Sequence, residues 1–150
     1  MPSSFFHANE RMCALTFMAW NDRLLTGIEA VDTDHRKLVE ILNRLYGGMQ
    51  SGLGREVLDD LFDELLDYTQ YHFAREERLF ERYDYPLALE HAFAHAKMAK
   101  WCTEARADFK RGELPGPSLQ VLSYLKDWLF DHIMETDKRF AEYVAARKKY

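Results

Sequence analysis

Residues 55–82 read REVLDDLFDELLDYTQYHFAREERLFER, and this stretch decides the fold. Its large apolar residues recur at intervals of three and four, which is the pattern of one buried face of an amphipathic helix. They are Leu58, Leu61, Phe62, Leu65, Leu66 and Phe73. Beyond the pattern, Tyr83-Asp84-Tyr85 leads into Pro86, and proline does not continue a helix. The stretch is therefore predicted to form one long helix.

Three further helical segments accompany this one between residues 32 and 150. The first is predicted to begin with Asp32 or Thr33 as its N-cap. It ends in a glycine-rich stretch that contains Gly47, Gly48, Gly52 and Gly54. Pro86 suits the first turn of the next helix, which continues to about Arg111, and Ser118 can cap the last helix. Four amphipathic helices with short connections predict an all-α fold, an antiparallel up-down-up-down four-helix bundle.

The N-terminal residues lie outside these helices. Residues 1–31 are predicted to form an arm that lies against the bundle and is anchored by Phe17 and Trp20. A chain of 150 residues has the size of one domain, which we place at residues 17–150. Residues 1–16 are then an N-terminal extension, of which residues 1–11 would be dispensable if Met12 or Met18 were the true start.

Composition excludes several classes of protein. The 25 acidic and 20 basic residues are interspersed, so no basic face emerges that could bind nucleic acid. No stretch approaches the roughly 20 apolar residues that span a bilayer, and residues 12–21 are too short and bulky for a signal peptide. Cys13 and Cys102 form no CxxC pair, which fits a reducing compartment. We therefore expect a cytoplasmic protein that has neither nucleic acid nor a membrane as a partner.

Five of the six histidines are distributed over the four predicted helices, so that each helix carries at least one. Two of them precede a carboxylate on the same helix, as His72 does with Glu76 and His132 with Asp137. The third helix carries an HxxxH motif at residues 91–95, in which the two imidazoles lie one turn apart. Histidines and carboxylates that face one core suggest metal ligands.

The height of these residues along the bundle provides an independent test. The chain rises about 17 residues from His35 to the end of the first helix and descends about 17 residues from Arg55 to His72, so the two histidines lie level. Similar distances from the turn at residues 112–117 place His95 and His132 level with each other. Seven potential metal ligands thus converge on one slice of the bundle: His35, His72, Glu76, His91, His95, His132 and Asp137.

Each motif also has an ordinary explanation. A single HxxxE or HxxxH arises often by chance, and Glu76 lies in a charged run, residues 75–78, where it could be a solvated side chain. Taken together, however, five neutral imidazoles and two acids in one core would be costly without a partner, and a bound metal removes that cost. His7 is interpreted as a surface residue of the tail, and Met98 and Met134 as core residues.

Five imidazoles and two carboxylates are too many ligands for one ion but suit two ions, with each carboxylate bridging both. Together with one solvent-derived bridge they fill all but one of the positions of two octahedra, and the open position can take a small ligand. Bridging carboxylates and six-fold coordination favour iron over tetrahedral zinc. The expected cofactor is a pair of non-haem iron ions with an oxo or hydroxo bridge.

With these residues identified, the sequence resembles the bacterial hemerythrins over residues 17 to about 143. The resemblance rests on Trp20-Asn21-Asp22, Gly27-Ile28 and Asp32-Thr33-Asp34-His35, followed in order by HxxxE, HxxxH and HxxxxD. It implies that one iron is held by His91, His95 and His132 and the other by His35 and His72, with Glu76 and Asp137 bridging. The open position would belong to the iron with two histidines.

The family binds dioxygen reversibly, so the resemblance implies an oxygen carrier, store or supply protein rather than an enzyme. The two carboxylates are fewer than those of ferritin-like di-iron oxidases, so less negative charge is available to stabilise highly oxidised iron. Small anions such as azide are further candidate ligands at the open position. Two alternatives stay open: an oxygen or redox sensor that acts through a separate partner, and a nitric oxide or peroxide reductase that needs an electron donor.

The resemblance also implies an apolar oxygen pocket, lined by Leu38, Phe73, Trp128, Leu129 and Ile133. Leu129 precedes His132 by about one helical turn, and Leu38 follows His35 by about one turn. Such a pocket would exclude water and protons from the bound oxygen. The same side chains also suit an ordinary bundle core, and the two roles are compatible.

Overall fold

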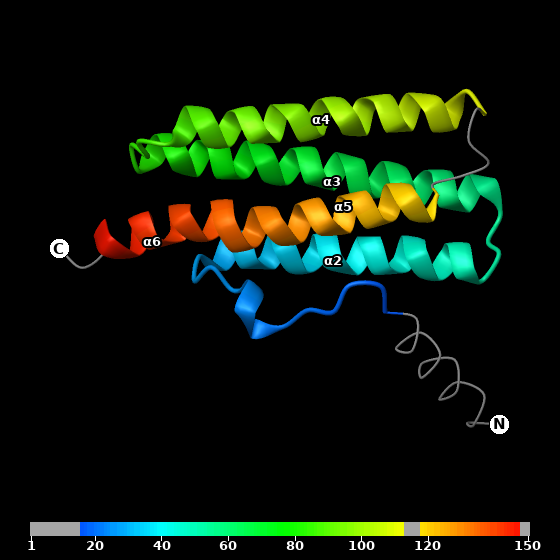
Figure 1. The fold of residues 1–150 in the computed structure, drawn as a ribbon, viewed down its shortest axis with the longest axis horizontal. Coiled ribbons are helices and arrows are strands. Elements are labelled where there is room, and N and C mark those ends of the chain that lie inside the picture. Colours follow the sequence, from blue (N-terminus) through cyan, green and yellow to red (C-terminus); the bar gives the residue numbers. More distant parts are fainter. Residues whose placement is uncertain (1–15, 113–117, 148–150) are drawn as a thin grey trace.

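Four antiparallel helical columns make up the fold (Figure 1). The computed structural model describes residues 16–112 and 118–147. Three columns are single helices and the fourth is composite: α2 (Glu29–Gln50), α3 (Arg55–Arg82), α4 (Ala88–Lys110), and then α5 (Leu119–Asp131), the π-helical turn η2 (His132–Asp137) and α6 (Lys138–Arg147). Within the described ranges there is no strand, and the predicted all-α four-helix bundle is confirmed.

Two apolar clusters fill the bundle, and the buried histidines lie between them. The larger cluster includes Leu42, Phe62 and Phe73, and the smaller one is built on Phe80 and Phe140. Phe73 stacks on the ring of His95 with centroids 4.0 Å apart, and Phe80 lies 4.4 Å from the ring of His91. The polar slice is therefore shielded from water by aromatic side chains on both sides.

The start of α2 differs from the prediction. The helix begins at Glu29, so Asp32 and Thr33 lie inside it and neither is the N-cap. The Asp32 carboxylate instead accepts hydrogen bonds from the backbone N–H groups of Thr26 (2.8 Å) and Gly27 (3.1 Å) and from the Thr26 hydroxyl (2.7 Å). Asp32 thus holds the preceding loop against the first turn of the helix. From the sequence alone, an aspartate with this role looks the same as an aspartate that caps the helix.

The other helix ends agree more closely with the sequence. Ser118 caps α5, because its hydroxyl accepts a hydrogen bond from the N–H of Val121 (3.1 Å). Gly52 follows α2 with φ of +71°, a backbone conformation that glycine adopts at little cost, whereas Gly47 and Gly48 lie within the helix. Pro86 lies just before α4 rather than in its first turn.

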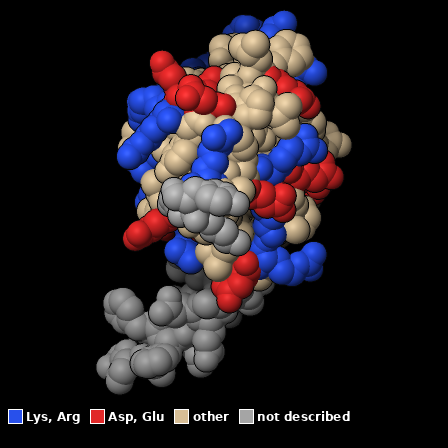
Figure 2. All heavy atoms as spheres, turned by 90° about the vertical axis from the view of Figure 1, so that its left-hand side faces the viewer, with Lys and Arg blue, Asp and Glu red and all other residues tan. Residues whose placement is uncertain are grey.

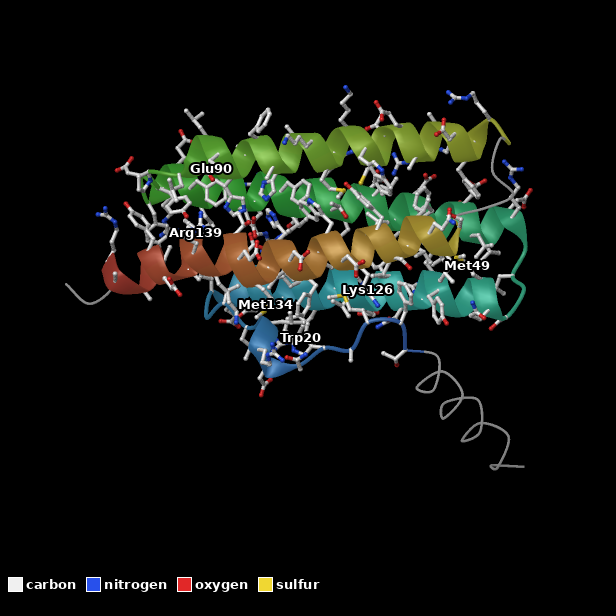
Figure 3. All side chains as sticks on the ribbon, in the orientation of Figure 1. Trp20, Met49, Glu90, Lys126, Met134 and Arg139 are labelled. Atoms are coloured by element: carbon white, nitrogen blue, oxygen red, sulfur yellow. The ribbon has the colours of Figure 1, made fainter. Side chains whose placement is uncertain are left out.

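Residues 16–28 form the described part of the N-terminal arm, which lies along α2 as predicted (Figure 1). The side-chain oxygen of Asn43 accepts hydrogen bonds from the N–H groups of Phe17 (3.0 Å) and Met18 (2.8 Å). The ring of Phe17 stacks on Tyr46. The guanidinium of Arg36 lies 5.1 Å from the centre of the ring of Trp20, which Figure 3 labels on this arm. The predicted extension, residues 1–16, lies outside the described part of the chain except for Thr16.

The surface carries charges of both signs. Figure 2 shows Lys and Arg side chains interspersed with Asp and Glu on the end of the bundle that faces the viewer. In the described part of the chain, none of the helices combines the length and the apolar character that crossing a membrane requires.

Candidate metal centre

All seven predicted ligands lie together in the middle of the bundle, and every column contributes. His35 comes from α2, while α3 provides His72 and Glu76, α4 provides His91 and His95, and η2 provides His132 and Asp137. None of the seven is more than 6% exposed. Histidines expected at the same height do meet, since the rings of His35 and His72 are 4.7 Å apart and those of His95 and His132 are 5.0 Å apart.

The donor atoms form two groups that share both carboxylates. The larger group consists of His91, His95 and His132 with Glu76 and Asp137, and the smaller group consists of His35 and His72 with the same two acids. Each group has all its ligand atoms within 4.8 Å of one another. The arrangement therefore offers two adjacent positions for a metal ion.

Each carboxylate turns one oxygen to each group. Oε1 of Glu76 lies 2.9 Å from Nε2 of His72, while Oε2 lies 3.1 Å from Nε2 of His95. Oδ2 of Asp137 lies 2.9 Å from Nε2 of His35, while Oδ1 lies 3.1 Å from Nε2 of His132. Glu76 and Asp137 are thus positioned to bridge two ions.

These short distances are not hydrogen bonds. Both oxygens of Glu76 and of Asp137, and Nε2 of His35 and His72, are buried without a hydrogen-bond partner in the described structure, although their neighbours lie about 3 Å away. Since the distances are short enough, it is the geometry of these contacts that does not suit hydrogen bonds. Leaving so many buried polar atoms unsatisfied would be costly, and a cation within each group of donors would satisfy them.

The spacing of the donors bears on the geometry of such an ion. With metal–nitrogen bonds of about 2.1 Å, neighbouring ligands are about 3.0 Å apart in an octahedron and about 3.4 Å apart in a tetrahedron. In the larger group, Nε2 of His132 lies 3.0 Å from that of His91 and 3.1 Å from that of His95. Oδ1 of Asp137 lies 3.0 Å from Nε2 of His91. These three pairs fit octahedral edges, whereas Oε2 of Glu76 lies farther from Nε2 of His91, at 3.4 Å.

The π-helical turn η2 explains how His132 and Asp137 reach the same site. In an α-helix each residue turns by about 100°, so two residues five apart point about 140° away from each other. In a π-helix the backbone pairs residues five apart, which brings such residues into line. The N–H of Lys138 accordingly donates to the carbonyl of Ile133. The HxxxxD spacing was the signal for this turn, which the sequence interpretation did not identify.

Without a metal, the site balances its two carboxylates with protons. Burial alone would lower the pKa of His72, but the charge of Glu76 and the hydrogen bond to Asp34 raise it to about 10. Burial likewise opposes the protonation of His91, yet Asp137 and Glu76 raise its pKa to about 9. For His95 burial dominates and lowers the pKa to about 4. Metal binding would displace the protons of His72 and His91.

Asp34 is a further residue of the site to which the sequence interpretation gave no role. It is 1% exposed, and its Oδ2 lies 2.9 Å from Nδ1 of His72. The Tyr68 hydroxyl donates to Oδ1 at 2.9 Å, and Nε of Arg75 lies 3.2 Å from Oδ2. Burial would raise the pKa of Asp34, but the hydrogen bonds from His72 and Tyr68 outweigh it and lower the pKa. The sequence signal was only its place beside His35.

A small apolar cavity adjoins the histidines. It has a volume of about 30 Å³ and is lined by Leu38, Leu42, Leu65, Thr69, Phe73, Met98, Leu125, Trp128 and Leu129. Its wall touches the site, because Phe73 stacks on His95 and Trp128 stacks on His132 with centroids 4.3 Å apart. Four of the five predicted pocket residues therefore line one cavity, whereas Ile133 is fully buried in the larger apolar cluster and does not line it.

Comparisons with known proteins identify the family. Residues 26–144 match the family described as Hemerythrin HHE cation binding domain. The chain is 36% identical over 132 residues to the Bacteriohemerythrin of Stenotrophomonas maltophilia, covering 88% of this chain and 84% of that protein. It is 35% identical over 130 residues to the Bacteriohemerythrin of Pseudomonas aeruginosa, covering 87% and 83%. A crystal structure of wild-type hemerythrin is similar with a TM-score of 0.77 and 25% identity, covering 84% of this chain and 96% of that one. The chain therefore belongs to the hemerythrin family, whose members bind oxygen at a di-iron site.

Proposed function

We propose that this protein binds dioxygen reversibly at a non-haem di-iron centre and serves as an oxygen carrier, store or supply. In this proposal one iron is held by three histidines and the other by two: His91, His95 and His132, and His35 and His72. Glu76 and Asp137 bridge the two ions, together with an oxo or hydroxo group derived from solvent. Such a pair can supply the two electrons that reversible oxygen binding requires.

The observation that carries the proposal is the division of each carboxylate between the two groups of histidines. A single ion would leave two imidazoles and two carboxylate oxygens unsatisfied in a buried site, which is costly. The donor spacing of about 3.0 Å supports six-coordinate ions, and six-fold coordination with imidazole and carboxylate ligands suits iron better than zinc.

The ligand count supports an open position at the ion with two histidines. The smaller group provides two nitrogens and two carboxylate oxygens, one fewer protein ligand than the larger group. The position left by that difference can accept dioxygen, or a small anion such as azide. Leu38 and Thr69, which line the apolar cavity, lie about one helical turn from His35 and His72, so a neutral, apolar ligand such as dioxygen also suits this side of the site.

The cavity supports reversible binding because it offers little to attract water. Eight of its nine lining residues present carbon, sulfur or an aromatic ring, and the hydroxyl of Thr69 already donates to the carbonyl of Leu65 at 2.7 Å. A dry site protects bound oxygen from protons and so favours its release unchanged.

An optical titration of the iron-loaded protein tests the proposal. The reduced protein should gain a visible absorption band on exposure to air and lose it when oxygen is removed, over repeated cycles. A band that forms once and cannot be reversed would contradict reversible binding and support a reductase. Metal analysis should give two irons per chain, and one iron per chain would contradict the di-iron centre.

A further inference from the structure

His72 has a buried carboxylate within hydrogen-bond distance of its outer nitrogen. Oδ2 of Asp34 lies 2.9 Å from Nδ1 of His72, and both residues are buried. By contrast, Nδ1 of His35, His91 and His95 is buried without a hydrogen-bond partner among the described residues. The Glu77 carboxylate lies 3.9 Å from Nδ1 of His95, beyond hydrogen-bond distance, and it is 42% exposed. The two ion positions therefore differ in their surroundings as well as in their histidine number.

The contact fixes which nitrogen of His72 carries the proton. An ionised carboxylate only accepts hydrogen bonds, so Nδ1 of His72 must be the donor toward Asp34. In the neutral imidazole, the form that binds a metal ion, Nε2 is then the nitrogen without a proton, and it lies 2.9 Å from Oε1 of Glu76 in the smaller ligand group. The carboxylate thus holds the imidazole in the form and orientation that a metal ion needs.

Two further side chains hold Asp34 in place and ionised. The Tyr68 hydroxyl donates to Oδ1 at 2.9 Å, and the Arg75 guanidinium lies 3.2 Å from Oδ2. Arg75 is itself positioned by a hydrogen bond to the Tyr71 hydroxyl and by contact with the Tyr71 ring. Asp34 is thereby restrained from three sides, and its charge is directed at His72.

We propose that Asp34 is a positioning residue for the ion held by His35 and His72, and that its charge makes this ion the more electron-rich of the two. The inference rests on the proposed di-iron function and deepens it. A negative charge on the outer side of a coordinated imidazole increases the basicity of the ligand, and losing such a partner costs about 10–100-fold in metal affinity. Because the open position belongs to this ion, Asp34 would favour electron donation to the incoming oxygen.

The first experiment measures stepwise iron binding. Metal-free protein is titrated anaerobically with Fe²⁺ against a competing chelator, for the parent, Asp34→Asn and Asp34→Ala. We expect the first ion to bind all three proteins equally and the second ion to bind both variants about 10–100-fold more weakly, with the larger loss in Asp34→Ala. Asp60→Asn removes the same charge from an exposed position of α3 and should bind both ions as the parent does.

A second readout separates an electronic role from a merely structural one. The midpoint potential of the fully loaded centre should rise in Asp34→Asn, because a negative charge that stabilises the oxidised ion is lost, and should not change in Asp60→Asn. Should Asp34→Ala fail to fold, Tyr68→Phe tests the same network while it keeps Asp34. Tyr68→Phe should lower the affinity for the second ion alone, and by less than Asp34→Asn does.

The outcomes distinguish the two proposals. If the parent binds two ions and Asp34→Asn binds them with the same affinities and potential, Asp34 has no positioning role although the di-iron function stands. An equal loss of affinity for both ions in Asp34→Asn would likewise overturn the assignment of Asp34 to one ion. A parent protein that binds only one ion would overturn the di-iron function itself.

Discussion

At the scale of single residues, Glu76 and Asp137 matter most to the metal centre, because each carboxylate directs one oxygen to each group of histidines. Replacing either by Ala should leave one carboxylate bridge in place of two and lower the iron content below two per chain. Glu142→Ala, an exposed acid on α6, should leave the iron content unchanged. Metal analysis of the three purified variants checks this prediction, which fails if all three lose iron equally.

Leu129 is the residue through which the cavity can be tested. Leu129 lines the cavity and lies about one turn before His132. Leu129→Ala removes three carbon atoms and opens a space that water can enter, since polar ligand atoms are near. We expect the variant to retain both irons and its helices but to change faster from the oxygenated to the oxidised form.

Stopped-flow mixing with oxygen follows that change in the parent and in Leu129→Ala. Leu119→Ala provides a matched control, because Leu119 is 52% exposed at the start of α5, far along the helix from the cavity. Equal decay rates in all three proteins, at equal iron content, would show that Leu129 is ordinary core.

At the scale of helices, the π-helical turn η2 reconciles two requirements. It aligns Asp137 with His132, and it also sets the rotation of α6, whose Phe140 packs against Phe80 and Tyr85 in the smaller apolar cluster. One residue fewer would give an α-helix in which the acid still lies one turn from His132. The helix beyond it would be rotated by about 100°.

Deleting the exposed residue Glu135 should therefore damage packing more than ligation. Phe140 and Val144 would turn away from the smaller cluster, and losing a buried aromatic side chain costs about 3–5 kcal/mol. We expect a lower thermal midpoint for the metal-free deletion variant than for Glu135→Ala, which keeps the chain length. Equal midpoints would mean that α6 tolerates the rotation.

The helices show what the sequence could and could not predict. Repeated apolar spacing identified α3, and proline, glycine and capping residues delimited the other columns. The cap at Ser118 was found because its hydrogen bond is local. The predicted start of α2 was wrong, because the Asp32 carboxylate accepts hydrogen bonds from the preceding loop instead of capping the helix. That loop has no repeated apolar spacing from which the contact could be predicted. Asp34 received no role because its contact with His72 joins residues 38 positions apart and depends on side-chain orientation.

At the scale of the whole molecule, the metal centre joins all four columns between two apolar clusters. An ion that binds only the folded chain stabilises it, by about 4 kcal/mol when its free concentration is about 1,000 times its Kd. Removing iron should therefore lower the thermal midpoint, and restoring Fe²⁺ should recover it. A calorimetric scan of the two forms checks this, and equal midpoints would show that the site does not bind iron in the folded state.

The metal-free protein should also depend on pH in a direction set by its histidines. Folding raises the pKa of His72 to about 10 and that of His91 to about 9, above the usual 6.5. Groups raised in this way contribute stability that is fully present below about pH 6.5 and is lost as the pH rises through the folded values. The free energy of unfolding should therefore fall between about pH 6.5 and about pH 10. In the iron-loaded protein the ions replace those protons, so this loss should be much smaller. Urea unfolding of both forms across that range measures the difference, and a metal-free protein that became more stable with rising pH would contradict the charge balance described for the site.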